Sequence, residues 1–274
     1  MPHPATLSIL LIGNTDRAEF AEARAALAAS GELTCVREMG TAEESLLAGL
    51  DPELIVFAQA YPGEFSHDEV DRLRRRAPLA RLAGLLGSWC EGEMRTGKPW
   101  PGVPRVYWHQ WPSRGQRQVR QLRQGRPSAW TTPITATEEE RLLADARRTS
   151  ERRQGLAAVA TRRAEMHDWL AEACRSRGLA TAWLWPPRPT RIGGATLGIF
   201  DGGDLRHGEE EQLRQMAAML RPAGVIALLD FPRLEDTHRA LAAGAAAVLA
   251  KPVFLDDLAW EMDRLMAQPT ATGQ

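Results

Sequence analysis

The chain alternates between compact apolar runs and amphipathic segments, and this alternation occurs twice. In the first half, five apolar runs have the length and composition of buried strands, at 6–13, 33–39, 53–60, 81–88 and 105–111. Helices are predicted in four further segments, at 15–31, 41–50, 66–78 and 113–124. Apolar residues at helical spacing indicate the first, capping-box spacing indicates the next two, and the last is polar. Strands that alternate with helices are typical of a parallel sheet with helices on both faces.

The second half repeats this plan. Its strand candidates are 155–162, 180–185, 195–201, 225–230 and 246–252, and its helix candidates are 164–178, 208–220, 234–244 and 255–267. We therefore predict an α/β fold of two tandem, doubly wound, parallel-sheet domains, at 5–123 and 154–267. Segment 124–153 between them is expected to be a linker, to about residue 136, followed by a polar connecting helix.

Local signals mark where some helices begin and where one is missing. Thr41, Ser66 and Thr137 are each followed three residues later by glutamate, the spacing of a capping box, so each is expected to start a helix. Between the fourth and fifth strands, "WCEGEMRTGKPWPGVP" (89–104) is too rich in Gly and Pro for a regular helix. We expect an irregular loop there.

Composition narrows the class of protein. The chain has 274 residues, of which 44% are hydrophobic and 25% charged, as in ordinary globular domains. A net charge of −1 gives no indication of nucleic-acid or membrane-surface binding. Three widely spaced cysteines argue against a disulfide framework or a zinc site. The N-terminus lacks a basic region and a long apolar run, so we expect no signal peptide and a cytoplasmic location.

The end of the chain suggests a family. "VIALLDFPRLEDTHRALAAGAAAVLAKPVFLDDLAWEM" (225–262) resembles the C-terminal half of a response-regulator receiver domain, and a weaker similarity covers 5–123. The resemblance implies two tandem flavodoxin-like domains with strand order 2-1-3-4-5 and a role in two-component signalling. In that family an aspartate after the third strand takes a phosphoryl group. An acidic pair after the first strand holds Mg²⁺, and a lysine before proline contacts the phosphoryl oxygens.

Only part of that set is present in the second domain. The resemblance places Asp201 at or near the phosphoacceptor position, with Asp204 as a neighbour, and Lys251 at the phosphate-sensing position. The acidic pair is absent, because the first strand of this domain ends at Thr161 and Arg162, and an arginine would repel a metal ion. We expect no metal site and no cofactor, and Mg²⁺ only if this domain is phosphorylated.

The first domain departs further from the family pattern. Ala58 stands at the phosphoacceptor position, and Gly13 and Asn14 replace the acidic pair. Trp111 precedes proline where the lysine is expected. In the family a Ser or Thr that ends the fourth strand senses the phosphoryl group, and Ser88 lies at or next to that position. Without a nucleophile this domain is predicted to be a pseudo-receiver.

The stretch that begins with this irregular loop and runs to Trp111 is the candidate interaction surface. We select its aromatic and basic residues because Trp and Arg are common interface anchors: Trp89, Arg95, Lys98, Trp100 and Trp111. The alternative is that the indoles form a small satellite core where the helix is missing. Trp108, inside the predicted fifth strand, is expected in the core.

Three hypotheses about function remain open. The first is a non-enzymatic signalling or scaffold protein with two phosphorylation-deficient receiver-like domains, which binds other proteins. Its partners would be proteins, with no nucleic acid or membrane, and its apolar helix faces are compatible with a homodimer. The second is a response regulator phosphorylated on Asp201. The third is a small-ligand-binding α/β protein, with its ligand near Asn14, Ser88 and the loop.

Overall fold

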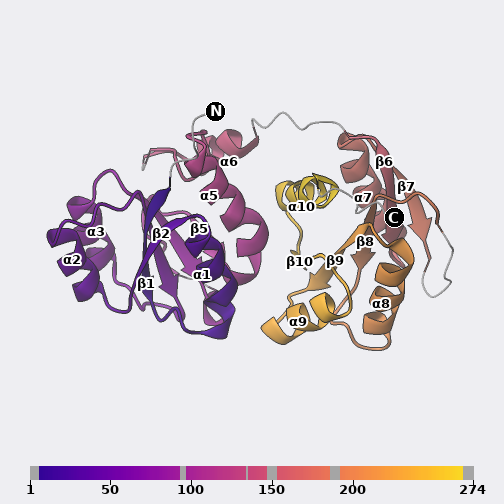
Figure 1. Cartoon of the computed structure of the whole chain (residues 1–274), viewed down its shortest axis with the longest axis horizontal. Coiled ribbons are helices and arrows are strands. Elements are labelled where there is room, and N and C mark those ends of the chain that lie inside the picture. The colour runs from indigo at the N-terminus through magenta and orange to yellow at the C-terminus, as the bar shows by residue number, and fades with distance from the viewer. Residues whose placement is uncertain (1–5, 93–96, 134, 147–152, 186–191, 268–274) are drawn as a thin grey trace. The chain divides into compact units, whose positions relative to one another are not determined.

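The computed structural model describes residues 6–92, 97–133, 135–146, 153–185 and 192–267. The chain forms two compact units, residues 1–148 and 149–274, and each is described by itself. The boundary falls within 124–153, the segment that we predicted to connect the domains. Figure 1 shows both units, with the first in indigo to magenta and the second in rose to yellow.

The first unit is a five-stranded parallel sheet with strand order β2-β1-β3-β4-β5. The strands are β1 (Leu7–Gly13), β2 (Gly31–Val36), β3 (Leu54–Gln59), β4 (Arg81–Leu86) and β5 (Arg105–Tyr107). The α-helices are α1 (Ala21–Ala28), α2 (Met39–Leu47), α3 (His67–Arg76), α5 (Gln116–Arg123) and α6 (Glu138–Ala146). All six residues of β3 are buried, because the central strand is covered on both faces.

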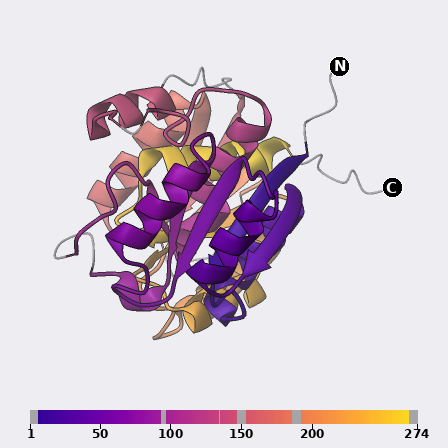
Figure 2. The ribbon, with the colours of Figure 1, turned by 90° about the vertical axis from the view of Figure 1, so that its left-hand side faces the viewer.

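Helices cover this sheet from both sides. One core cluster packs Met39 and Ala42 of α2 and Val70 and Leu73 of α3 against Phe57 and other residues of β1 and β3. Figure 1 shows α1 on the opposite side of the sheet from α2 and α3, and Figure 2 gives the same unit in a second view. The arrangement is doubly wound, as predicted.

The second unit has the same architecture. Its strands are β6 (Gly155–Ala160), β7 (Leu179–Leu184), β8 (Leu197–Asp201), β9 (Gly224–Asp230) and β10 (Ala247–Lys251), all parallel, in the order β10-β9-β8-β6-β7. Its helices are α7 (Ala164–Ser176), α8 (Glu209–Leu220), α9 (Leu234–Ala242) and α10 (Leu255–Ala267). Counted within each unit, both sheets have the order 2-1-3-4-5 of flavodoxin-like folds. The predicted fold class is therefore confirmed.

Two separate apolar layers hold the second unit together. One contains Leu170 and Cys174 of α7 with Leu258 and Met262 of α10. The other contains residues of α8 and α9, including Leu213 and Ala240. Alternate residues of β8 enter the two layers, Ile199 the first and Phe200 the second, because successive strand side chains point to opposite faces.

Some local predictions are confirmed and others are wrong. The capping box of Ser66 with Glu69 is present, and Thr137 and Glu140 exchange the same pair of hydrogen bonds. The start predicted at Thr41 is wrong, because α2 begins two residues earlier at Met39. The spacing of Thr41 and Glu44 therefore falls inside a helix that starts without a side-chain cap.

The fifth strand of the first unit is shorter than predicted. β5 ends at Tyr107, and a 3₁₀ helix (Trp108–Gln110) and a π-helical turn (Trp111–Gly115) follow. Trp108 is buried, but in a helical turn and not in a strand. In the irregular loop, the described residues form only one short 3₁₀ helix, Ser88–Cys90.

The predicted linker packs against the first unit over part of its length. Trp130 is buried, and its ring lies 5.9 Å from that of Trp111. The Trp130 backbone N–H donates to Gln118 of α5. Of the helices that the structure describes, none is long and apolar enough to cross a membrane.

Candidate functional site

Four strand ends of the second unit bring polar side chains together at one edge of the sheet. β6, β8 and β9 are neighbours, and β10 follows at the edge. Because all are parallel, their carboxyl ends meet there. The structure thus brings the predicted residues Asp201, which ends β8, and Lys251, which ends β10, next to Thr161 and Asp230.

Asp201 is buried and its carboxylate is surrounded by donors. Its side chain is only 4% exposed. Lys251 Nζ donates to Oδ1 at 2.8 Å, and the Thr161 hydroxyl donates to Oδ2 at 2.7 Å. Arg163 Nη2 reaches both oxygens, at 2.9 and 3.0 Å. Two cations and a hydroxyl therefore use most of the hydrogen-bonding capacity of this carboxylate.

Lys251 is held in place by three oxygens. Besides Asp201, its ammonium group donates to the Gly202 carbonyl and lies 3.0 Å from a carboxylate oxygen of Asp230. The lysine side chain is 10% exposed, whereas that of Asp230 is 57% exposed. An ammonium group has three protons, so this site satisfies each of them.

Opposing effects act on the pKa of Asp201. Burial raises this pKa, but hydrogen bonds from Lys251, Thr161 and Arg163, together with the charge of Lys251, outweigh burial and leave the pKa below its ordinary value. Asp201 is therefore ionised near neutral pH. A carboxylate with a lowered pKa in the folded state stabilises the fold above its unfolded pKa.

This shift predicts an acid-dependent stability difference. Asp201→Asn is expected to lower the free energy of unfolding by a constant amount above about pH 5, because the carboxylate is ionised in both states there. Below about pH 4 the difference is expected to shrink as wild-type Asp201 takes up a proton on unfolding. Urea unfolding at several pH values measures it. Asp204→Asn, at an exposed carboxylate, is the matched control. A difference in unfolding free energy between wild type and Asp201→Asn that stays constant to the lowest pH would contradict the lowered pKa of Asp201.

The residues present do not fit a divalent cation. Mg²⁺ requires carboxylates and waters, but the groups beside Asp201 are the hydroxyl of Thr161 and the guanidinium of Arg163. Arg163 makes an ion pair with Asp201 where an acidic residue would be needed. Over the part of the chain that the structure describes, no three His, Cys, Asp or Glu side chains are grouped so that they could hold a metal ion.

Several members of this cluster were not predicted from the sequence. We expected Arg162 at this position, whereas Arg163 makes the hydrogen bonds to Asp201. We predicted no role for the Thr161 hydroxyl, which contacts Asp201, or for the Asp230 carboxylate, which pairs with Lys251. Both are polar residues at strand ends, and this position was the sequence signal that could have identified them. Asp204 is exposed and pairs with Arg206, apart from this cluster.

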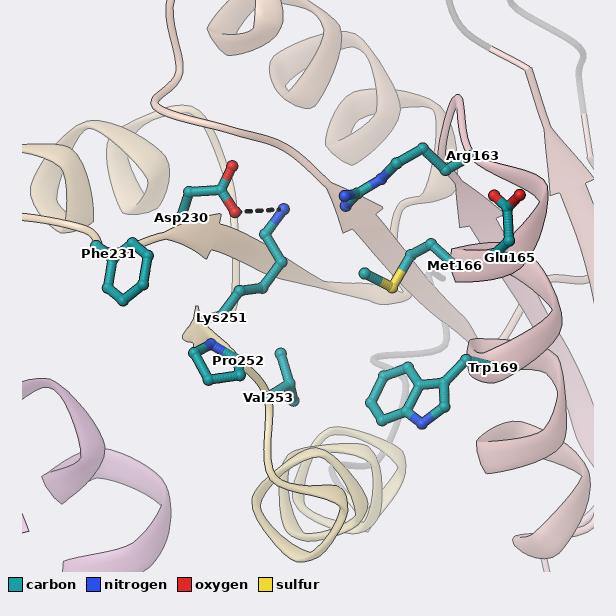
Figure 3. A pocket seen from close by; sticks show the side chains of 9 residues that line it. All are labelled: Arg163, Glu165, Met166, Trp169, Asp230, Phe231, Lys251, Pro252 and Val253. Carbon is teal, nitrogen blue, oxygen red and sulfur yellow. Dashed lines mark ion pairs between the residues drawn. The ribbon is translucent and has the colours of Figure 1, made fainter.

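A pocket of about 710 Å³ opens beside this cluster. Arg163, Glu165, Asp230 and Lys251 supply its polar part, and the apolar walls are Met166, Trp169, Phe231, Pro252 and Val253. Figure 3 shows Lys251 directed at Asp230, with Phe231 on one side of the pocket and Met166 and Trp169 of α7 on the other. Phe231 is 75% exposed, so its ring is available for contact.

The corresponding edge of the first unit is different. Ala58 lies in β3 opposite Gly13, so the structure has no nucleophile at this position. A buried carboxylate, Glu19, lies nearby and accepts hydrogen bonds from the Ser88 backbone N–H at 2.8 Å and from Arg17 at 2.7 Å. The Ser88 amide at the end of β4 is thus already paired with an acid from the same unit.

The candidate interaction residues of the first unit differ in their exposure to solvent. Trp89 is 74% exposed and Lys98 is exposed, whereas Trp100 and Trp111 are buried. Arg95 lies outside the described residues. Trp100 packs between Phe57 and Phe65, with ring centroids 5.4 and 6.4 Å away, as in the satellite-core alternative. Binding of a partner by this loop stays a prediction, and among the candidates that the structure describes Trp89 and Lys98 are the exposed ones.

Sequence comparisons identify no relative. No family model matches the chain, and no curated protein is significantly similar to it.

Comparison with solved structures finds receiver domains. The receiver domain of the Francisella response regulator 1452 is 15% identical, with a TM-score of 0.34, over 41% of this chain and 96% of that one. A response regulator from Thermotoga maritima is 16% identical, with a TM-score of 0.35, over 42% and 98%. A probable two-component system response regulator/GGDEF domain protein is 13% identical, with a TM-score of 0.37, over 94% and 98%. These similarities lie at the level of the fold, and the site is interpreted from its own residues.

Proposed function

We propose that this is a non-enzymatic signalling or scaffold protein, in which two phosphorylation-deficient receiver-like units bind other proteins. The observation that carries the proposal is the state of Asp201, whose carboxylate is bound by Lys251, Thr161 and Arg163 within its own unit. The cluster serves as a structural ion-pair network at the sheet edge.

The chemistry of phosphoryl transfer explains why such a network opposes phosphorylation. A carboxylate nucleophile must present a free lone pair in line with the leaving group, and cations must neutralise the oxygens of the transferred group. Here Arg163 and Lys251 are already paired with the nucleophile itself. Attack by Asp201 would require these ion pairs to open. The residues beside Asp201 do not fit a metal ion that could neutralise the phosphoryl oxygens in their place.

Features of the pocket in the second unit support protein binding. Phe231 has φ = 42°, in the left-handed region, and it precedes a buried proline, Pro232. A bulky residue rarely adopts this conformation, and a residue before proline normally has an extended backbone. Its neighbours fix it, because Asp230 N–H donates to the Gly203 carbonyl and the Asp230 carboxylate pairs with Lys251. An exposed ring in a strained conformation does not favour stability, whereas it suits an interface anchor.

This interpretation predicts that Phe231 can be replaced to the benefit of stability. Phe231→Gly is expected to raise the free energy of unfolding by up to about 1 kcal/mol, because glycine adopts a positive φ without strain. Phe231→Ala, which keeps the Cβ atom, is the matched control and should change stability by less than about 0.5 kcal/mol. Chemical denaturation measures both. A clear loss of stability in Phe231→Gly would show that the ring packs against the fold.

Phosphorylation itself tests the proposal. The protein is incubated with acetyl phosphate and Mg²⁺, and intact mass is measured against Asp201→Asn. We expect no phosphoryl adduct on either protein. An adduct on the wild type that Asp201→Asn abolishes would favour the alternative, a response regulator phosphorylated at Asp201, and would refute the proposal.

A further inference from the structure

An exposed strand edge with tryptophans lies at β7, the strand of the second unit next to β6. β7 is the last strand of its sheet, and among the strands that the structure describes it pairs with β6 alone. Its sequence with the next residue, "LATAWLW" (179–185), contains no charge, proline or glycine. Edge strands usually carry such residues, because unpaired backbone groups invite pairing with another strand.

Each of the other three edge strands contains a charged residue. β2 carries Glu32, the three-residue β5 carries Arg105, and β10 ends at Lys251. β7 is thus the one edge strand among the described sheets without a charged residue.

The backbone direction of β7 follows from a hydrogen bond. The Leu184 carbonyl accepts from the Thr161 N–H at the end of β6. Since the N–H and C=O of one strand residue point to the same side, Leu184 and Ala182 face β6. Thr181 and Trp183 therefore direct their N–H and C=O groups away from the sheet.

Large aromatic side chains lie along the same edge. Trp183 is 41% exposed and Trp185 is 54% exposed, with ring centroids 5.6 Å apart. His167 of α7 stacks on Trp183 at 4.6 Å, and the Trp183 indole donates to the Thr161 carbonyl. Trp183 is therefore held with one side of its ring against the unit and the rest in solvent. Ordered aromatic residues of this kind are frequent interface anchors.

We propose that the outer edge of β7 pairs antiparallel with β7 of a second copy of this chain, and that the two sheets become continuous through a two-fold axis at Ala182. In this register Thr181 lies opposite Trp183 of the second copy, and both residues direct their backbone groups outward, as a hydrogen-bonded pair requires. Leu179 lies opposite Trp185 in the same way.

The strand is complementary to itself in this register. Each tryptophan meets a smaller side chain, threonine or leucine, and aromatic residues pair well with aliphatic and β-branched residues across strands. Because the strand has no charged residue, pairing of two copies brings no like charges together and buries no charge. The charges of a charged peptide would have no partner along this neutral edge. A two-fold axis makes both copies contribute the same surface. These features favour a second copy as the occupant.

Sedimentation velocity of the full chain tests the pairing, from low micromolar to several hundred micromolar protein. The wild type is expected to dimerise. Thr181→Pro removes an outward N–H without removing a bond to β6, so its dissociation constant should rise at least about tenfold. Thr181→Lys should act in the same direction by placing a charge at the interface. Thr181→Val, which keeps the backbone donor, is the control and should dimerise like the wild type.

Oxidative cross-linking tests the register. In a Cys35→Ser background, Ala182→Cys places two cysteines directly opposite each other, at a Cα separation of about 4.5 Å that permits a disulfide. Ala180→Cys is the matched control, because its counterpart in the second copy is residue 184. We expect a cross-linked dimer from Ala182→Cys alone. A monomeric wild type, an unaffected Thr181→Pro dimer or equal cross-linking of both cysteine variants would overturn the proposal.

Discussion

Lys251→Met is expected to lower the free energy of unfolding of the second unit by about 3 kcal/mol, because it leaves a buried carboxylate without its most buried cation. The side chains of Asp201 and Lys251 are 4% and 10% exposed, and their charged atoms lie 2.8 Å apart. Asp201 would keep Arg163 and Thr161, so the loss should lie at the lower end of the range for broken buried pairs. Native-state hydrogen exchange of amides in β8 and β10 measures this unit by itself.

Two further variants separate the pair from the rest of the network. Arg163→Met removes a cation whose side chain is 54% exposed, so it should cost about 1 kcal/mol or less. Lys251→Met combined with Asp201→Leu removes both charges and should recover most of the stability, because a buried ion pair replaced by apolar groups is often close to neutral. A Lys251→Met protein as stable as the wild type would mean that the pair is solvated in solution.

Trp100→Ala should destabilise the first unit by about 4 kcal/mol, since removal of a buried indole leaves a large cavity. The ring packs on Phe57 and Phe65, its Nε1 donates to the Phe65 carbonyl at 3.2 Å, and it lies against Gly84. Trp89→Ala, in the same loop but at a 74% exposed residue, is the matched control and should change stability by less than about 0.5 kcal/mol. Urea unfolding compares the two. Equal losses would show that Trp89 also belongs to the packed loop.

The sequence pattern was sufficient for the fold because its signals are periodic. Apolar runs such as β3 are buried along their whole length, so they are recognisable as central parallel strands. The ends of parallel strands also converge at one edge of the sheet. The resemblance to receiver domains placed Asp201 and Lys251 at two of these strand ends, and the 2.8 Å contact between them agrees with that placement.

Features that do not follow the periodic pattern of strands and helices could not be predicted from the sequence. Whether Arg162 or Arg163 reaches Asp201 depends on the direction of one side chain after a strand end. The difference between exposed Trp89 and buried Trp100 arises in an irregular loop, where spacing says nothing about burial. The left-handed backbone of Phe231 has no sequence signal either, because phenylalanine before proline predicts the opposite conformation.

Under the proposed function, Asp201 and Lys251 form a fixed structural pair that does not sense a phosphoryl group. Amide NMR of the whole protein during a titration with beryllofluoride and Mg²⁺ tests it most directly, with Asp201→Asn as the control. We expect the amides of Asp201, Gly202 and Lys251 to stay unchanged at millimolar Mg²⁺. Saturable shifts at these amides that Asp201→Asn abolishes would contradict the claim and show that the second unit is a working phosphorylation switch.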